Sequence, residues 1–533
     1  MCIGSIVLLL LAMVCGCGKN LSDKNFRYWI PSEPATLDPQ IATGYTAQLL
    51  IDNLYEGLVR LDADGELSPG MAIKWDSSQN DTMFTFYLLH NSRWSDDATL
   101  VTADDFLFGI QRALAPDTNS STCEPLYCIK NAKAVHEGRL PSMDLGVKAL
   151  NPFTLEITLE EPMPNFPEIT MLAPFMPCNR KLFESSGGKY GLETETTHSN
   201  GPFRMAKNNG WRHGTSIRII KSVAYRGAQE VVPAQVMFLT GEDGKPPLNP
   251  IDDLMNYKFD ALELSRETAA VATEKGMEVL NFEDTTWAMC FNTSLEPFGN
   301  TKIRQALTMA VNRADLLSAL EKGHHSTDVL LPPITTFAGK PYDDWRSDIL
   351  LPSQDAEQSK ILLAEGLEEA DFNSLPAISI LVPDDLEHRK LGDTFLKYWQ
   401  ETLGFSMNLE PLSLEALQAR ITEGEYQVAI CPLRAEKNGP GSFLSMFKSD
   451  SLHNPAFLYS SQYDALLDVS TGTPVSSEVS AYLQAEEYLL STSVVYPLYN
   501  QGRFFGLAPT VSDIIFRPFK NSVDFIRAGK SKG

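Results

Sequence analysis

The alternation of strand and helix patterns between residues 377 and 433 constrains the fold more than any other feature of the sequence. Short apolar runs typical of buried strands alternate there with amphipathic segments of helical period. In chain order these are a strand at 377–383, a helix at 386–402 ended by Gly404, a strand at 405–412, a helix at 414–424 and a strand at 426–433. Such alternation indicates β-α-β units and a sheet covered on both faces, so the sequence predicts an α/β fold.

The loop after the last of these strands is a candidate binding site on topological grounds alone. In open α/β sheets, ligands gather beyond the strand ends, where loops converge. The segment YQVAICPL at 426–433 ends directly before such a loop. We therefore expect functional side chains just after residue 433.

The first half of the chain is also mixed α and β. Residues 84–89 and 152–160 predict strands, the second with apolar and polar side chains in alternation. Thr102 and Asp105 have the spacing of a capping box, which predicts a helix at 101–114. A chain of 533 residues is too long for one core, which suggests about three domains or one large composite domain.

The chain begins with an apolar run that stops at small residues and a cysteine, LAMVCGCGKN at 11–20. The run is roughly fifteen residues long, whereas a spanning helix needs about 20. It is typical of a secretory signal segment, and VCGC resembles the lipobox of bacterial lipoproteins. We therefore expect a lipoprotein signal peptide at 1–17 with Cys17 acylated, although no Lys or Arg precedes the apolar core. A buried N-terminal helix is the alternative.

The net charge of −24 limits the partners of this chain. Residues 1–17 contain no Asp, Glu, Lys or Arg, so removing them leaves this charge unchanged. An acidic field repels phosphate backbones and anionic membranes, so nucleic acid is excluded as a partner. The charge serves solubility, or it favours cationic ligands.

The eight cysteines divide between the signal segment and the rest of the chain. If Cys2 and Cys15 leave with the signal and Cys17 carries lipid, five remain: Cys123, Cys128, Cys178, Cys290 and Cys431. Five is an odd number, so at least one thiol stays free or pairs elsewhere. The spacing of Cys123 and Cys128 allows a local bridge, and Cys178 is expected to be a buried thiol.

Signatures of enzymes and metal sites are missing from the sequence. Leu140 stands where the second histidine of a zinc-protease motif would follow His136, and the segments 241–247 and 439–445 lack the phosphate-loop and nucleophile-elbow patterns. His324 and His325 are adjacent, and two ligands seldom suffice for a metal, so we expect a surface pair. The sequence predicts no enzyme, no cofactor and no metal.

Several blocks, taken in order, resemble one family. They are TLDPQIATGYTAQLLIDNLYEGLVRLDADGELSPGMAIKW, RWSDDATLVTADDFLFGIQRAL, DLGVKALNPFTLEITLEEPMPNF, NGPFRMAKNNGW and EPFGNTKIRQALTMAVNRADLL. They are similar to the successive blocks of the bacterial extracellular solute-binding proteins of family 5, the oligopeptide-binding proteins of ABC importers. The likeness runs from about residue 27 to about residue 527.

The resemblance implies a two-lobed periplasmic binding protein, type II-like, with an extra third domain and a hinged cleft between the lobes. It places lobe I at 21–55, 179–284 and 504–533, the extra domain at 56–178 and lobe II at 285–503. It implies short peptides as ligands, and an ABC permease and ATPase in the cytoplasmic membrane as partners. We expect a monomer in the periplasm or on the outer face of that membrane, held by lipid on Cys17.

Family binding residues carry over where positions match. Glu436 occupies the place of a carboxylate that pairs with the α-ammonium of the bound peptide, and His388 matches a histidine that can meet the peptide's carboxylate. Backbone contacts are implied for Thr43, Gly44 and Tyr45, and for the strand from Pro432 through Leu433 to Arg434. Arg434 could serve an acidic ligand group or neutralise Glu436. Tyr45 and Trp287 fall in segments that line the cleft, where ligand contact and core packing are equally open.

Two departures from the family concern the strand at 426–433. Pro432 has no N–H, so one donor to a peptide is absent. The positions bridged in relatives match Thr285 and Arg434, while Cys290 and Cys431 lie in the same two segments. If those segments run antiparallel, the residue numbers of any two facing residues add up to a constant. The sum for Cys290 and Cys431 differs by only two from the sum for the positions bridged in relatives, so a relocated disulfide is possible.

Other functions stay as alternatives. Within the family, the ligand could be a murein peptide, a nickel chelate or haem. A secreted hydrolase would need a nucleophile and base that the sequence does not reveal. A purely structural surface lipoprotein would have little need of a hinged cleft.

Overall fold

The computed structural model describes most of the chain. The described residues are 24–63, 65–78, 80–240, 245, 247–320, 324–346, 351–435, 437–451, 454–468, 474–520 and 522–531. They form two compact units. Unit 1 holds the described residues up to Val279 together with Phe505–Arg517 and the C-terminal segment, and unit 2 holds Leu280–Phe504 and Pro518–Lys520. The chain passes from one unit to the other close to the proposed lobe boundaries at 284/285 and 503/504, and the proposed extra domain lies within unit 1.

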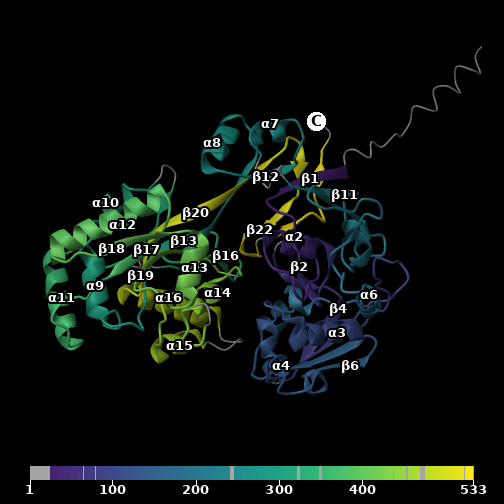
Figure 1. Cartoon of the computed structure of the whole chain (residues 1–533), viewed down its shortest axis with the longest axis horizontal. Coiled ribbons are helices and arrows are strands. Elements are labelled where there is room, and N and C mark those ends of the chain that lie inside the picture. Colours follow the sequence, from purple (N-terminus) through teal and green to yellow (C-terminus); the bar gives the residue numbers. More distant parts are fainter. Residues whose placement is uncertain are drawn as a thin grey trace, which may run out of the picture. The chain divides into compact units, whose positions relative to one another are not determined.

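Unit 2 is built on a mixed sheet whose strands run in the order β18-β17-β19-β13-β20 (Figure 1). The strands are β13 (Val279–Phe291), β17 (Ser379–Pro383), β18 (Asn408–Leu412), β19 (Val428–Leu433) and β20 (Val495–Leu507), with the short β14 (His325–Ser326) paired to β20. β17 runs parallel to both β18 and β19, while β19 is antiparallel to β13. The β-α-β units predicted from the sequence are confirmed.

Both faces of this sheet are buried, as the apolar runs indicate. Alternate residues of β13 divide between two cores: Trp287 and Met289 face one, and Ala288 and Cys290 face the other. Side chains alternate across a strand, so a strand covered on both faces must be apolar throughout. Helices α9, α10, α11 and α12 contribute to the first core, and α14, α15 and α16 to the second.

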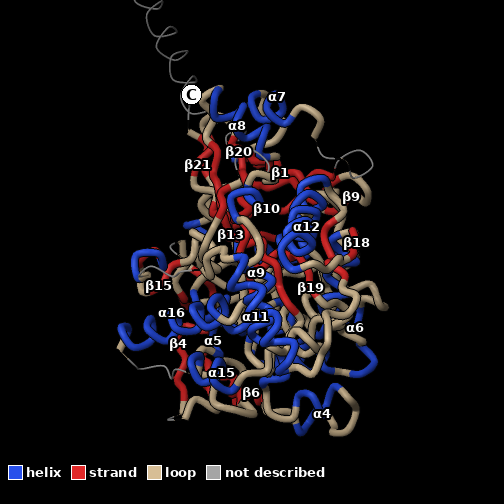
Figure 2. The backbone as a smooth tube through the Cα atoms, turned by 90° about the vertical axis from the view of Figure 1, so that its left-hand side faces the viewer, coloured by secondary structure: helices blue, strands red, loops and turns tan. Residues whose placement is uncertain are grey.

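The helices of unit 2 are α9 (Thr301–Met309), α10 (Arg313–Leu317), α11 (Ala356–Glu369), α12 (Leu386–Tyr398), α13 (Leu414–Thr422), α14 (Pro440–Leu444), α15 (Ser461–Leu467) and α16 (Val475–Ser491). Helices α9 and α11 lie side by side (Figures 1 and 2). Gly366 permits this approach, because a Cβ there would lie 2.7 Å from the side chain of Ile303. Helix α12 continues as a π-helical turn, Trp399–Leu403, which ends at Gly404 with φ of +75°.

Unit 1 has a central sheet in the order β12-β1-β11-β10-β8. Its strands are β1 (Asn25–Ile30), β8 (Phe203–Met205), β10 (Ser216–Lys221), β11 (Gln235–Thr240) and β12 (Ala261–Leu264), with β9 (Trp211–Arg212) paired to β10. β1 is parallel to both neighbours, and its alternate residues Phe26, Tyr28 and Ile30 are buried. This pattern places the loop after β1, which contains residues 31–44, at one edge of the sheet.

A second, antiparallel sheet of unit 1 has the order β4-β5-β7-β6. Its strands are β4 (Ala72–Ser77), β5 (Met83–Leu88), β6 (Val147–Asn151) and β7 (Thr154–Thr158). β5 and β7 confirm the strands predicted at 84–89 and 152–160. Helix α3 (Ala103–Leu114) begins with the predicted capping box, in which the side chains of Thr102 and Asp105 bond each other's backbone.

Shorter elements complete the described chain. Unit 1 also contains helices α2 (Tyr45–Leu54), α4 (Ala132–His136), α5 (Phe166–Ile169), α6 (Arg180–Ser185), α7 (Pro250–Met255) and α8 (Arg266–Glu274). Its short strands form the pairs β2 (Val59–Leu61) with β3 (Leu67–Pro69), β21 (Val511–Ser512) with β24 (Gly529–Lys530) and β22 (Ile515–Arg517) with β23 (Ser522–Asp524). Unit 2 has the strand pair β15 (Thr336–Phe337) with β16 (Lys340–Pro341). In the described part of the chain, no helix is both long and apolar enough to cross a bilayer.

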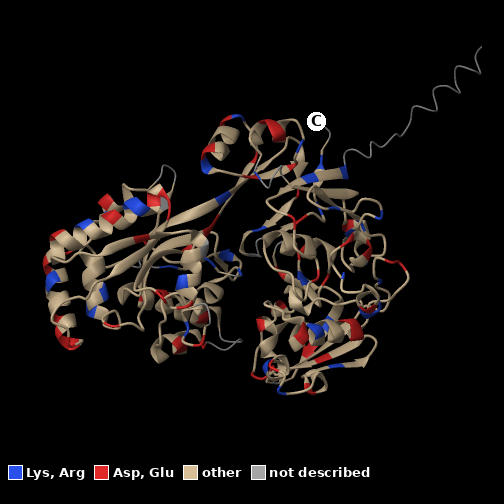
Figure 3. Cartoon of the chain, viewed as in Figure 1, with Lys and Arg blue, Asp and Glu red and all other residues tan. Residues whose placement is uncertain are grey.

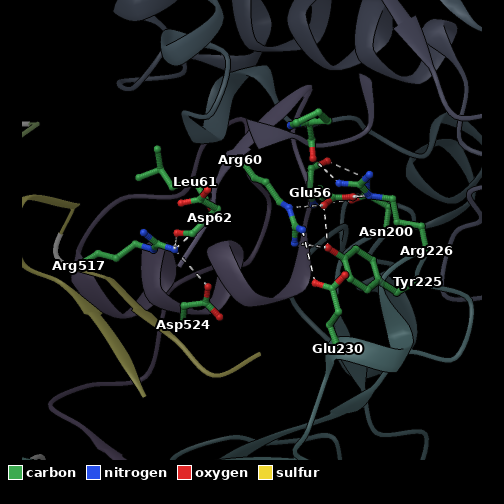
Figure 4. A network of polar contacts seen from close by, with 11 residues as sticks. Glu56, Arg60, Leu61, Asp62, Asn200, Tyr225, Arg226, Glu230, Arg517 and Asp524 are labelled. Atoms are coloured by element: carbon green, nitrogen blue, oxygen red, sulfur yellow. Dashed lines mark hydrogen bonds and ion pairs between the residues drawn. The ribbon is translucent and has the colours of Figure 1, made fainter. Parts of the chain in front are cut away.

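Buried charges in unit 1 are held by networks of partners. Glu56, after the end of α2, accepts a hydrogen bond from the Tyr225 hydroxyl at 2.8 Å and lies 3.5 Å from Arg226 and 3.9 Å from Arg60 (Figure 4). Burial raises the pKa of Glu56, while the two guanidiniums and Tyr225 oppose that shift. The network fixes the chain where α2 leads into β2.

The loop after β1 is anchored by a second buried pair. Arg112 of α3 donates to both carboxylate oxygens of Asp38, with Nη1 at 2.7 Å from Oδ2, and to the side chain of Gln40. Both charged groups are buried, and a buried ion pair needs both members because a lone charge has no compensation. This pair ties the residues just before Thr43 to α3.

We predict that Arg112→Met destabilises the protein by about 3 to 5 kcal/mol, because it leaves the Asp38 carboxylate buried without its partner. Urea unfolding followed by circular dichroism measures the change. The matched control is Arg139→Met, since Arg139 pairs with Glu137 on the surface of the same unit. It should change stability by less than about 1 kcal/mol, and equal losses for the two variants would contradict the assignment.

Candidate functional site

The carboxyl ends of β17 and β19 lie at the same edge of the unit 2 sheet, because these strands are parallel neighbours. β17 leads through Asp384 and Asp385 into α12, and β19 leads into the loop before α14. This is the loop that the topology predicts as a site. Glu436, the residue proposed to meet the peptide's ammonium, lies outside the described residues.

The end of β19 has one edge without a paired strand among the described residues. β17 pairs with β19 only at Val428 and Ala429. β13 pairs along the whole strand, from Phe291 opposite Val428 to Thr286 opposite Leu433. Residues 430–433 therefore have a paired strand on one side alone, and an edge without a paired strand is where a further strand can add.

Two of the predicted contact residues follow directly along β19. Leu433 is buried in the second core of unit 2, so its side chain belongs to that core. Arg434 is partly exposed, and its guanidinium lies 3.0 Å from the buried carboxylate of Asp284 and donates to the Pro518 carbonyl. Pairing with Asp284 is a third role for Arg434. The sequence had suggested two others, contact with an acidic ligand group and neutralisation of Glu436.

His388 lies on the first turn of α12 and is buried. Its Nδ1 is 2.7 Å from Oδ2 of Asp385, and its Nε2 is 3.1 Å from the hydroxyl of Tyr499. The indole of Trp287 packs on the imidazole with ring centroids 4.1 Å apart. Both ring nitrogens are thus engaged by protein groups, so contact with a peptide carboxylate requires His388 to exchange one of these partners.

The position of His324 differs from the surface position expected from the sequence. We expected His324 and His325 to be a surface pair, but the His324 side chain is only 10% exposed. Its Nδ1 lies 2.7 Å from Glu387, and its ring stacks on Tyr499 at 4.4 Å. The expectation fails because it used local spacing only, whereas partners from α12 and β20 cover this histidine.

The two tryptophans of this region belong to the first core of unit 2. Trp399 is fully buried and donates from Nε1 to the Leu307 carbonyl. Trp287 is buried as well, and its Nε1 donates to the side chain of Gln501 at 2.6 Å. Core packing is therefore the role that the contacts of Trp287 support.

The two cysteines near this strand lie close together. Cys290 faces Ala429 and Cys431 faces Ala288, so the pairing is antiparallel, as the bridge argument assumed. The sulfurs are 3.6 Å apart and both thiols are free. Contact with Cys431 and burial raise the pKa of Cys290. Cys123, Cys128 and the buried Cys178 are also free thiols.

In unit 1, Thr43, Gly44 and Tyr45 form the entry to α2. Gly44 is the N-cap, and its φ of +86° is one that side chains with a Cβ rarely adopt. Thr43 is exposed, while the hydroxyl of Tyr45 lies 3.3 Å from that of Tyr28. The sequence therefore sets a sharp turn here that leaves the backbone before α2 accessible.

The start of the same loop is fastened by a cluster around Glu33. Burial opposes ionisation of Glu33, but hydrogen bonds from the Gly214 N–H at 2.6 Å and Trp211 Nε1 at 2.5 Å, and contact with His213, lower its pKa. His213 Nδ1 lies 2.5 Å from Glu33 and Nε2 3.2 Å from Glu193. These two carboxylates raise the pKa of His213.

The chemistry of the described residues suits binding. Within the described ranges, no group of three or more His, Cys, Asp or Glu side chains is placed to hold a metal ion. Lys and Arg lie among Asp and Glu on the helices of each unit, as Figure 3 shows.

The sequence did not indicate three residues of this region, Asp284, Asp385 and Tyr499. Only Asp385 had a local signal, because it stands three residues before His388 as the N-cap of α12.

Comparison with known proteins identifies the family. The model of the bacterial extracellular solute-binding proteins, family 5, matches residues 66–454. The dipeptide-binding protein DppE of Bacillus subtilis is 27% identical over 88% of this chain and 85% of its own. The probable deoxycholate-binding periplasmic protein YgiS of Escherichia coli is 28% identical over 94% of this chain and 92% of its own.

Solved structures share the fold. The murein tripeptide-binding protein MppA of Escherichia coli matches with a TM-score of 0.69 at 24% identity, over 96% of this chain and 99% of that chain. These likenesses confirm the predicted fold class, an α/β periplasmic binding protein with an extra domain.

We predict that the contribution of His213 to stability depends on pH. The pKa of His213 is raised in the folded protein, so its stabilisation is fully present below the unfolded pKa of about 6.5 and is lost as pH rises through the folded value. Thermal unfolding of the wild type and His213→Gln between pH 5.5 and pH 9 measures it. The melting temperatures should differ at low pH and converge at high pH, and a constant difference would contradict this assignment.

Proposed function

Because the chain belongs to the bacterial extracellular solute-binding proteins, family 5, we propose that it captures short peptides and delivers them to an ABC permease and its ATPase. The observation that supports peptides most directly is the open edge of β19 at residues 430–433. The names of two relatives agree, since DppE is a dipeptide-binding protein and MppA a murein tripeptide-binding protein, whereas the name of YgiS gives deoxycholate as its ligand.

Physical chemistry favours this type of recognition for peptides of varied sequence. Such peptides share only their main chain and two terminal charges. A receptor can grip the main chain by strand addition, which supplies hydrogen bonds without reading side chains. Pro432 offers no N–H at one position, so the proposed pairing uses the backbone groups of its neighbours. The role involves binding alone and needs no chemical step.

Glu436 is our proposed partner for the ammonium of the peptide. It follows β19 by three residues, directly after the buried Ala435. A buried ammonium is stabilised only when it meets a carboxylate. Thr43, Gly44 and Tyr45 are proposed as further backbone contacts, with Leu433 and Arg434 on the strand side.

The contacts of His388 and Trp287 change the roles that we propose for these two residues. We propose that His388 supports Tyr499 and Trp287 and reaches a peptide carboxylate only after leaving Asp385 or Tyr499. Trp287 would act as the packing layer beneath these groups. The relocated disulfide between Cys290 and Cys431 stays a proposal for oxidising conditions, in which the free thiols would lose two protons and two electrons to an oxidant such as a disulfide exchange partner.

The family is extracellular, and we propose that this member is tethered by lipid on Cys17 at the outer face of the cytoplasmic membrane. Residues 1–17 lie outside the described residues, so the support for this proposal is the sequence alone. One acyl chain binds a membrane weakly and several bind firmly. A tethered monomer would stay near the permease that receives its ligand.

We predict that Glu436→Gln weakens binding of free-amine tripeptides by about 3 to 5 kcal/mol, because the ammonium loses its carboxylate. N-acetylated tripeptides should lose much less, since they carry no charge at that end. Isothermal titration calorimetry measures both. The matched control is Glu423→Gln, which changes an exposed carboxylate of the same unit.

Equal losses for free-amine and acetylated peptides would remove Glu436 from this role. Native mass spectrometry of the protein as purified tests the ligand class independently. Bound masses of two to five amino acids support the proposal. A metal chelate, haem or a bile acid in their place would identify another ligand of the same fold.

We predict that Cys17→Ser releases the protein from membranes. After expression in a bacterium that acylates lipoproteins, the wild type should enter the detergent phase in a Triton X-114 partition, and the variant should stay in the aqueous phase. Identical partitioning of both would contradict the anchor at Cys17 and leave the peptide-binding proposal unaffected.

A further inference from the structure

The central sheet of unit 1 has an edge at which β1, β11 and β12 all begin. β1 is parallel to both neighbours, with Asn25 opposite Gln235 and Tyr28 opposite Ala261. β10 runs antiparallel to β11, so it ends at the same edge with Lys221. This edge lies opposite the one from which the loop 31–44 leaves β1.

Hydrogen bonds join four segments at this edge. The segment 221–234 donates backbone N–H groups to the carbonyls of Lys24 and Ile526, each at 2.8 Å. Lys530 Nζ donates to the Asn25 carbonyl at 2.6 Å. The guanidinium of Arg27 donates to the Tyr257 carbonyl at 3.4 Å. We call these segments the amino edge, which consists of residues 24–27, 221–234, 255–261 and 526–530.

The amino edge is basic, although the whole chain has a net charge of −24. Its carboxylates are Glu230 and Asp260, and the second is buried 2.8 Å from Lys530. Its basic residues are Lys24, Arg27, Lys221, Arg226, Lys258, Arg527 and Lys530.

Pairing with neighbouring acids does not cancel this charge. Glu56 lies 3.5 Å from Arg226, and Asp253 lies 3.3 Å from Lys258. Basic side chains stay in excess after these pairs are counted. At physiological salt, charges are screened over about 8 Å, so a surface close to this edge meets its local positive charge before the acidity of the whole chain.

Large apolar side chains are exposed among these charges. Val223, Val232, Met255 and Tyr257 are between 39% and 73% exposed. Membrane-surface binding combines apolar side chains that enter the headgroup region with Lys and Arg that attract anionic lipids. The amino edge has both features on one side of unit 1.

The start of the described chain places this edge within reach of the proposed tether. Residues 18–24 separate Cys17 from β1. An extended chain spans at most about 3.6 Å per residue, so these residues reach no farther than about 25 Å. Lipid on Cys17 would therefore keep the amino edge close to the bilayer surface.

We propose that the amino edge docks on the anionic phospholipid headgroups of the membrane that holds the tether. The proposal rests on the lipid anchor under the proposed function and adds a contact made by the folded protein itself. Docking at this edge leaves the loop 31–44, at the opposite edge of the sheet, clear of the bilayer.

The test compares two vesicle compositions with the acylated full-length protein bound through its own lipid. The vesicles contain phosphatidylcholine alone, or phosphatidylcholine and phosphatidylglycerol in equal amounts. Hydrogen–deuterium exchange followed by mass spectrometry reports on segments 221–234 and 255–261. We expect their exposed amides to exchange about fivefold more slowly on the anionic vesicles, because Lys and Arg near an anionic surface are attracted to it. High salt should remove this difference.

A triple charge reversal at the amino edge should also remove the protection. The three exposed residues changed are Lys24→Glu, Lys258→Glu and Arg527→Glu.

A matched triple variant keeps the same net charge but changes another surface of unit 1. It carries three reversals at exposed residues on and near α4 and β6, namely Lys133→Glu, Arg139→Glu and Lys148→Glu. This variant should keep the protection on anionic vesicles.

Three results would contradict the proposal. Equal exchange on the two vesicle compositions would overturn the docking surface and leave the anchor at Cys17 standing. Loss of protection in both triple variants would assign the effect to net charge and overturn the docking surface as well. A protein that does not stay on either kind of vesicle would overturn the anchor and the docking surface together, while peptide binding is measured separately by calorimetry.

Discussion

The parallel pairing of β17 with β18 and β19 is the constraint on which the proposed site in unit 2 depends. Parallel strands bring their carboxyl ends to one edge, and the segments that leave this edge carry His388, on the first turn of α12, and Arg434. The sheet can be covered on both faces because β19 and the part of β13 from Trp287 to Phe291 are apolar, as their division between two cores shows. Binding groups are thus confined to the strand ends, and the rest of each strand supplies the rigid support that holds them.

Buried carboxylates paired with arginine recur where loops leave the sheets. Asp38 with Arg112 and Glu56 with Arg60 and Arg226 fix the chain on either side of α2 in unit 1. Asp284 with Arg434 and Arg503 does the same beside β19 in unit 2. A buried pair adds little net stability, but losing one member is costly. Such pairs therefore specify a loop's path more than they strengthen the fold.

Local patterns were sufficient to predict some elements of the fold, namely those between 377 and 433 and three elements of unit 1. Apolar runs and the glycine at 404 predicted β17, α12 and β19. The antiparallel pairing of β13 with β19 was only an assumption of the disulfide argument. Contacts between distant segments carry no such pattern. Arg503 and Asp284 are 219 residues apart, and nothing in the sequence near either residue indicates the other. The same limit explains why His324 was expected at the surface, although Tyr499 and Glu387 cover it.

We propose that a peptide adds as a strand to the edge of β19 at residues 430–433, with its amino group at Glu436. A crystal structure of the protein with a bound tripeptide tests this most directly. The account predicts main-chain hydrogen bonds between the peptide and the backbone of these residues, with the ammonium within about 3 Å of the Glu436 carboxylate. A peptide whose main chain makes no contact with β19, or whose amino group points away from Glu436, would contradict it.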